Sequence, residues 1–164
     1  MPLTPEDREE IRELVATYDW AIDFGLFDEY AATFTADGTF WVDGFGADSR
    51  VGGRHTGYAA LFDFAKWNYE AYKGYLRHWN NGVQNMKGDG DHATMRSYMI
   101  GITVGMLGEA HILETGVYYD RLRRVDGQWR FEERHFICDP QYEHRMLTWD
   151  PEKFARDIGG NRGQ

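Results

Sequence analysis

Hydrophobic and polar positions at the start of the chain follow the period of an α-helix. The apolar residues fall three and four positions apart, as one helical face requires, at Ile11, Leu14, Val15, Tyr18 and Ile22. Thr4 is a typical cap, Pro5 suits the first helical position, and Gly25 is a typical terminator. The pattern therefore predicts a helix that begins at Pro5 and ends before Gly25.

Two more helices and a series of strands follow. Residues 27–35 and 58–72 have helical spacing, and residues 39–43 have the pattern of a strand between them. Later in the chain the pattern changes to long β-runs, over residues 75–86, 93–107, 113–125 and 128–138. Helices followed by an antiparallel sheet predict an α+β fold, in which a long, curved sheet wraps over about three helices and leaves an open cone.

The length of 164 residues fits one domain, since domains commonly run between about 100 and 200 residues. We assign residues 1–140 to this domain and residues 141–164 to a C-terminal tail, in which Asp150 and Pro151 can open a short helix. The segment from Gly44 to Gly57 holds five glycines and is expected to be a loop that acts as a lid.

Composition narrows the class of protein. The net charge of −9, from 27 acidic and 18 basic residues, argues against nucleic acid and against an anionic membrane surface as partners. No apolar run approaches the ~20 residues of a membrane span, and the acidic start MPLTPEDREE is no signal peptide, so we expect a cytoplasmic protein. Aromatic residues make up 16% of the chain, which suits a pocket for a flat small molecule.

Asp23 stands in the last turn of the first predicted helix, within the stretch YDWAIDFG. Helical spacing sets it off the apolar face, so the pattern alone leaves both a solvated residue and a functional one open. A carboxylate there faces the negative end of the helix dipole, which disfavours its ionised form. Its position is therefore unusual.

His78 opens the strand predicted in YLRHWNNG and shares one face with Asn80, Gly82 and Gln84. This polar row faces either the core, where each member needs a partner, or solvent. Histidine titrates near neutral pH, and a carboxylate that orients its ring makes it a useful general base. If the fold brings Asp23 and His78 together in an aromatic pocket, the protein is a small enzyme that needs no cofactor.

Other candidates carry weaker signals. Tyr18 lies on the apolar stripe, where a core role and a catalytic role both fit. His135 and Cys138 are three apart in a predicted strand, so they point to opposite faces and make a poor metal pair. The sequence has no metal-binding motif, phosphate-binding loop, complete dinucleotide fingerprint or serine-hydrolase elbow. We therefore expect neither a metal nor a cofactor.

Three stretches resemble the SnoaL-like branch of the NTF2-like superfamily. The opening of that branch is similar to EIRELVATYDWAIDFGLFDEYAATFTADGTFW, and its closing hairpin is similar to YYDRLRRVDGQWRFEERH. The segment RHWNNG falls where the branch often has a strand-opening histidine. The resemblance covers most of residues 6–139 and implies an NTF2-like cone. In dehydratase-like members, similar to scytalone dehydratase and bile-acid 7α-dehydratase, an Asp late in the first helix pairs with this histidine, and Asp23 and His78 match those positions.

The resemblance also implies roles for these residues. Tyr18 matches a tyrosine that the bile-acid enzyme has five residues before the Asp, whereas Ile22 stands where scytalone dehydratase has a tyrosine. The implied activity is that of a cofactor-independent lyase, in which His78 removes a proton from carbon, Asp23 orients its ring, and Tyr18 hydrogen-bonds a carbonyl or the leaving oxygen. The side chains expected to contact the substrate are Tyr98, Tyr118, His135, Asn80 and Trp41.

The implied substrate is an aromatic or polycyclic small molecule. It would lose water, or it would be a lignin-derived diaryl compound that releases formaldehyde by retro-aldol C–C cleavage. Isomerisation and polyketide cyclisation stay open, as does ligand binding without chemistry. A non-catalytic alternative is the beta subunit of a ring-hydroxylating dioxygenase, whose closing hairpin resembles RLRRVDGQWRF. The exposed sheet face of this fold implies a homo-oligomer, with a trimer favoured over a dimer.

Overall fold

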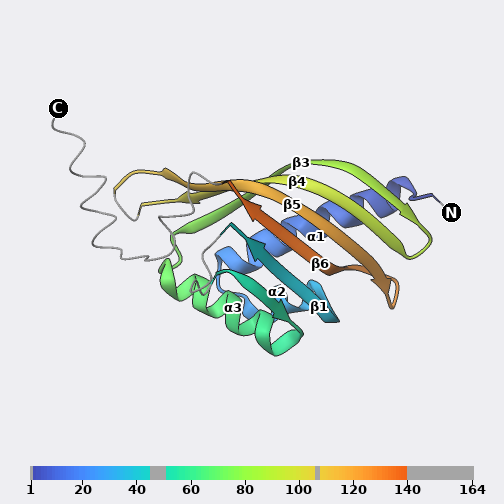
Figure 1. The fold of residues 1–164 in the computed structure, drawn as a ribbon, viewed down its shortest axis with the longest axis horizontal. Helices are drawn as coiled ribbons and strands as arrows, with labels where there is room; N and C mark the ends of the chain where they lie inside the picture. Colours follow the sequence, from blue (N-terminus) through green and yellow to red (C-terminus); the bar gives the residue numbers. More distant parts are fainter. Residues whose placement is uncertain (1, 45–50, 106–107, 140–164) are drawn as a thin grey trace.

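The computed structural model describes residues 2–44, 51–105 and 108–139. Its helices and strands, drawn in Figure 1, are α1 (Pro5–Asp23), α2 (Phe27–Ala32), β1 (Phe34–Asp43), β2 (Gly53–Thr56), α3 (Tyr58–Ala71), β3 (Leu76–Asp89), β4 (His92–Thr103), β5 (His111–Val125) and β6 (Gln128–Cys138). No helix among the described residues is long and apolar enough to cross a membrane.

The ends of α1 follow from local sequence, as predicted. The Thr4 side chain accepts a hydrogen bond from the backbone N–H of Asp7 at 3.1 Å, and the Asp7 carboxylate accepts one from the Thr4 N–H at 2.9 Å. This reciprocal cap satisfies two N–H groups that lack partners within the helix. The helix ends at Asp23, two residues before Gly25, whose φ of 73° favours glycine.

The described strands form one six-stranded sheet in the order β2-β1-β6-β5-β4-β3. Strands β1 and β6 are parallel, and all other neighbours are antiparallel, so the sheet is mixed. Helix α1 packs against β3 and β6, whereas α3 packs beside β1 and β2 (Figure 1). The predicted α+β fold with three helices before the long strands is confirmed.

The two faces of the sheet differ in burial. The inner face, which we define as the face that α1 covers, carries buried side chains such as Leu122 and Phe131, exposed by 1% and 0%. The outer face is the opposite one, and it leaves Trp79, Tyr98 and Tyr119 exposed by 61%, 59% and 49%. A polar side chain on the inner face therefore lies in the core.

Some predicted boundaries differ from the structure. The helix predicted over residues 27–35 ends at Ala32, because β1 already begins at Phe34 and pairs there with β6. The loop expected between Gly44 and Gly57 is wrong in its last part, where β2 pairs antiparallel with β1. Residues 45–50 and the predicted C-terminal tail lie outside the described residues, so the lid and the domain limit at residue 140 stay predictions.

Candidate active site

Asp23 and His78 meet on the inner face, where the end of α1 lies against the start of β3. The Nδ1 atom of His78 is 2.6 Å from Oδ1 of Asp23, and the two side chains are only 7% and 6% exposed. Both oxygens of Asp23 also accept the backbone N–H of His78, at 3.1 and 3.0 Å. The helix end and the strand are thereby joined by one carboxylate, and neither residue is solvated.

The pair has the electrostatics of an oriented base. Burial by itself lowers the pKa of His78, but the hydrogen bond and charge of Asp23, with the charge of Asp19, raise that pKa above its usual value. Because Nδ1 donates to the carboxylate, Nε2 carries the lone pair. Within the described part of the chain, Nε2 has no hydrogen-bond partner, so it is available to accept a proton.

A second acid lies one helical turn before the first. Asp19 accepts hydrogen bonds from the backbone N–H of Asn80, at 3.3 Å, and from the Asn80 side-chain amide. Burial raises the pKa of Asp19 to about 6, although the charges of Arg134 and His78 oppose the shift. His78 and Asn80, the first two members of the polar row predicted on one face of β3, thus point inward, and the structure brings the predicted residue Asn80 beside the pair.

The centre of the inner face is a buried cation, Arg134 of β6. Its Nη2 donates to Oδ1 of Asn80 at 3.1 Å, and its guanidinium lies 4.1 and 3.9 Å from the ring centroids of Tyr18 and Tyr118. Nε of Arg134 is 3.5 Å from a carboxylate oxygen of Asp120, and both side chains are fully buried. Sequence reasoning did not identify this cation.

The predicted residues Tyr18 and Tyr118 lie together beside Arg134, each about 1% exposed. Their ring centroids are 6.3 Å apart, and the Tyr18 hydroxyl accepts a hydrogen bond from Tyr30 at 3.4 Å. Burial raises the pKa of Tyr18 to about 12, so the hydroxyl keeps its proton and can donate it in a hydrogen bond. Tyr18 lies about 7.5 Å along the helix axis from Asp23.

Two further acids on β5 escaped the sequence analysis. Asp120 and Glu114 are 2% and 5% exposed, and burial raises the pKa of each to about 7, although Arg134 opposes the shift at Asp120 and His78 opposes it at Glu114. Their signal is an alternating pattern, because they share the inner face with Tyr118. An acid that lies an even number of positions from a buried aromatic residue of the same strand can therefore be identified from the sequence.

Three predicted substrate-binding residues do not belong to this cluster. Tyr98 is 59% exposed on the outer face, and Trp41 stacks on His135 with 3.9 Å between ring centroids on that same face. The structure places them on the opposite face from Asp23 and His78, so their role in substrate binding stays a prediction. For His135 the cause is a β-bulge, because Phe131 pairs with Leu122 and Glu133 with Arg121, which leaves one extra residue between them. The bulge turns Arg134 inward and His135 outward.

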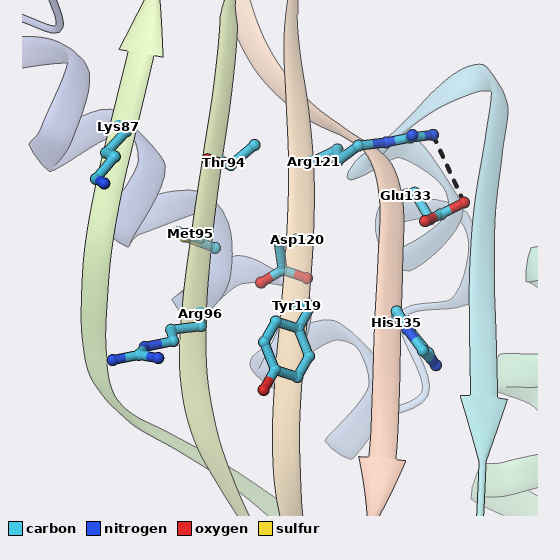
Figure 2. Close-up of a pocket in the computed structure, with 9 residues that line it drawn as sticks. All are labelled: Lys87, Thr94, Met95, Arg96, Tyr119, Asp120, Arg121, Glu133 and His135. Atoms are coloured by element: carbon cyan, nitrogen blue, oxygen red, sulfur yellow. Dashed lines mark ion pairs between the residues drawn. The ribbon is translucent and has the colours of Figure 1, made fainter.

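A hollow on the outer face is separate from the Asp23–His78 pair. Figure 2 shows this pocket of about 420 Å³, which is lined by Lys87, Thr94, Met95, Arg96, Tyr119, Asp120, Arg121, Glu133 and His135. Arg121 and Glu133 form an ion pair at 3.6 Å at its edge (Figure 2). Neither member of the buried pair lines it.

Among the described residues, no three His, Cys, Asp or Glu side chains gather in a way that could hold a metal ion. Two of the buried acids instead face nitrogen groups, since Asp23 faces His78 and Asp120 faces Arg134. This arrangement can move a proton and can stabilise a developing negative charge near the cation.

Comparisons with known proteins agree with this architecture. A family model of the SnoaL-like domain matches residues 4–135. A search of curated proteins gives no match. A protein of unknown function from Mycobacterium tuberculosis is 28% identical with a TM-score of 0.71, and the alignment covers 95% of this chain and 89% of that one.

Two solved structures from Novosphingobium aromaticivorans are also similar. An NTF2-like protein with a cystatin-like fold is 24% identical with a TM-score of 0.71, over 88% of this chain and 90% of that one. A scytalone dehydratase candidate is 22% identical with a TM-score of 0.64, over 81% of this chain and 84% of that one. Together with the family match, these structures confirm the expected NTF2-like fold.

Proposed function

The chain belongs to the SnoaL-like family, and on that premise we propose that it is a cofactor-independent lyase acting on an aromatic or polycyclic small molecule. His78 is the general base and Asp23 orients its ring. Tyr18 is the hydrogen-bond donor to the substrate. The neighbouring scytalone dehydratase candidate supports a dehydratase-like reaction through likeness of fold.

The observation that carries the proposal is the buried contact of 2.6 Å between His78 and Asp23. Burying two groups that can carry charge costs free energy, and a surface position would avoid the cost. The carboxylate uses both oxygens to hold the backbone and ring of His78, which leaves the ring only one orientation in which Nδ1 donates to it. A base with a fixed ring and a free Nε2 is what proton abstraction from carbon requires.

In a dehydration, Nε2 of His78 accepts the proton from the carbon next to a carbonyl. The electrons of that C–H bond form the new C=C bond, the bond from the neighbouring carbon to its hydroxyl oxygen breaks, and the oxygen leaves as water after gaining a proton. Negative charge develops on the carbonyl oxygen meanwhile. Tyr18 and Tyr118, whose ring faces lie 4.1 and 3.9 Å from the Arg134 guanidinium, form a setting that stabilises such charge.

The same base supports a retro-aldol reaction. In that reaction His78 takes the hydroxyl proton of a primary alcohol β to a carbonyl in a lignin-derived diaryl compound. The adjacent C–C bond breaks and formaldehyde leaves, while the electron pair of that bond forms the enolate of the carbonyl, which then takes up a proton. The aromatic share of 16% suits a substrate with two rings. Isomerisation and polyketide cyclisation need the same abstraction without a leaving group, so the substrate decides among these reactions.

The test is to incubate the purified chain with two probes. A β-hydroxytetralone gives a naphthol on loss of water, and a diaryl ketone with a primary alcohol β to its carbonyl gives formaldehyde on cleavage. We expect one product from the wild type, none from His78→Gln, and an unchanged rate from His92→Gln, which alters an exposed histidine. A wild type that forms neither product, and exchanges no carbon-bound hydrogen of the tetralone in D₂O, would refute the lyase.

The alternative of a non-catalytic beta subunit has one observation in its favour. The outer face exposes Trp79, Tyr98 and Tyr119, an aromatic surface suited to contact with another chain.

The same surface also suits contact between copies of this chain, and we propose that these copies assemble there as a trimer rather than a dimer. Light scattering of the pure chain measures the assembly, and turnover by the pure chain would exclude a subunit that depends on a catalytic partner.

A further inference from the structure

Glu114 is a buried acid that the proposed reaction of Asp23, His78 and Tyr18 does not use. It lies on β5 in register with Gly101 of β4, and Gly101 is in register with His78 of β3. The three positions thus form one row across the sheet, and the outer two are about 10 Å apart at the backbone. His78 and Glu114 stand at opposite ends of this row on the inner face.

The glycine in the middle lets the acid approach the base. A Cβ atom added at Gly101 would lie 2.8 Å from Cγ and 3.1 Å from Oε1 of Glu114. The Glu114 side chain therefore occupies the space that a side chain at Gly101 would fill, and it leans across β4 toward His78. Consistent with this, its charge is one of those that raise the pKa of His78.

Glu114 lacks the partners that a structural acid would have. It is 5% exposed, and its Oε2 atom is buried without a hydrogen-bond partner among the described residues. A buried carboxylate in that state costs free energy that a neutral residue of the same shape would avoid. Burial raises the pKa of Glu114 to about 7, so near neutral pH a large share of the molecules keeps a proton on this carboxyl.

We propose that Glu114 is the proton donor of the lyase, opposite the base His78. The inference rests on the proposed function, and it names the group that completes the reaction. Nε2 of His78 takes the proton from carbon, and Oε2–H of Glu114 gives its proton to the hydroxyl as the C–O bond breaks. Water leaves, Glu114 becomes a carboxylate and His78 an imidazolium, and one proton exchanged through solvent restores both.

Other titratable groups around the two sites set the pH at which this works. Asp23 and Asp19 of α1 face His78 and raise its pKa. On the other side, the charge of Glu114 raises the pKa of Tyr72, which follows α3, and the charge of Cys138 of β6 raises that pKa too. The base must be neutral and the acid protonated. Turnover should therefore rise with pH as His78 loses its proton and fall as Glu114 loses its own, near pH 7.

The test compares two leaving groups on one carbon skeleton. A β-hydroxytetralone needs a proton on its leaving oxygen, whereas the matching β-chlorotetralone loses chloride without one. For Glu114→Gln we expect a loss of at least 10²-fold in kcat with the alcohol and less than about threefold with the chloride, because general acid catalysis contributes typically 10²–10⁴-fold. The fall in rate at high pH should also disappear. Glu10→Gln, at an exposed position of α1, is the matched control.

A second variant tests the geometry without removing the acid. Gly101→Ala places a methyl group where the Glu114 side chain lies, so it should lower the rate with the alcohol more than the rate with the chloride. In both variants the pKa of the His78 ring, measured by NMR without substrate, should fall, because a negative charge is removed or moved away.

The outcomes separate the two proposals. A wild type inactive on both tetralones, with no exchange of their carbon-bound hydrogen, refutes the lyase and the donor together. A wild type that needs His78 for both probes, but whose Glu114→Gln variant loses both rates equally or neither, refutes only the donor. An unchanged pKa of His78 in Glu114→Gln would contradict the approach of Glu114 to His78 across β4.

Discussion

Two histidine–carboxylate pairs occur among the residues that the structure describes, one on each face of the same sheet. Inside, His78 Nδ1 is 2.6 Å from Asp23, and outside, His135 Nε2 is 2.9 Å from Asp43. Their hydrogen-bond distances are similar, but their surroundings are not. The inner side chains are 7% and 6% exposed, whereas the outer ones are 16% and 49% exposed.

The partners of each carboxylate explain the difference in chemistry. Asp23 is held by the backbone of His78 as well as by its ring, and both side chains are more than nine-tenths buried. Asp43 is half exposed at the end of β1, and its histidine lies flat on Trp41 at 3.9 Å. Solvent screens the outer pair, so its interaction is worth about 0–1 kcal/mol. A close histidine–carboxylate contact is therefore no evidence of a base unless the fold also buries and orients it.

The largest difference between the two pairs should appear when each histidine is replaced by alanine. His78→Ala should lower kcat/KM for the β-hydroxytetralone by about 10²–10⁴-fold, since the general base is lost. His135→Ala should leave kcat/KM within about twofold, because its ring lies on the other face. Equal losses in the two variants would show that burial does not distinguish the pairs.

Arg134 on the inner face and Arg54 on the outer face should contribute very differently to the stability of the fold. Arg134 is fully buried with Asp120, whereas Arg54 lies 3.9 Å over the exposed side of Trp41 and 3.5 Å from Glu133. Arg134→Gln should lower the free energy of unfolding by about 3–5 kcal/mol, because buried acids lose their cation. Arg54→Gln should cost about 0–1 kcal/mol. Urea denaturation measures both, and a small effect at Arg134 would contradict its central place in the inner face.

Changing the carboxylates should have a smaller effect than removing the base. Asp23→Asn keeps a hydrogen-bonding side chain but no longer fixes the tautomer of His78, so kcat/KM should fall by about 10²-fold, or about 3 kcal/mol in activation free energy. Asp43→Asn, the matched change outside, should leave the rate within about twofold. A normal rate in Asp23→Asn would leave the pair without an orienting role.

The smallest expected effect is on the pH dependence of stability, where a buried acid of the inner face and an exposed acid should have opposite signs. Burial raises the pKa of Asp120 to about 7, so the folded state binds a proton more tightly than the unfolded state does. Its contribution is complete below the unfolded pKa and is lost as the pH rises through about 7. Exposed Asp37, whose pKa is lowered by its hydrogen bond to Thr35, has the opposite sign.

Unfolding in urea at several pH values between about 4 and 8 checks this sign. The wild type should lose stability as the pH rises over this range, and Asp120→Asn should flatten the curve. If the Asp120→Asn variant keeps the full slope, the buried acids other than Asp120 carry the effect, and Glu114 is then the next one to change.

Much of the fold follows from local sequence. The cap at Thr4, the end of α1 before Gly25 and the alternation of β5 depend on neighbours a few residues away, and each was predictable. Asp23 and His78 were found from their places in two motifs. The sequence could not bring them together, because they are 55 positions apart and the contact depends on how α1 packs on β3.

The sequence by itself determined the order of the three helices and of every strand except β2, the predicted family and two candidate residues. Only the tertiary structure decided which side chains share a face. One extra residue between Phe131 and Glu133 turns Arg134 into the core and His135 out of it, and the missing side chain of Gly101 lets Glu114 cross a strand. Such effects depend on register between distant strands, which is set by packing over the whole sheet and not by the pattern of any one segment.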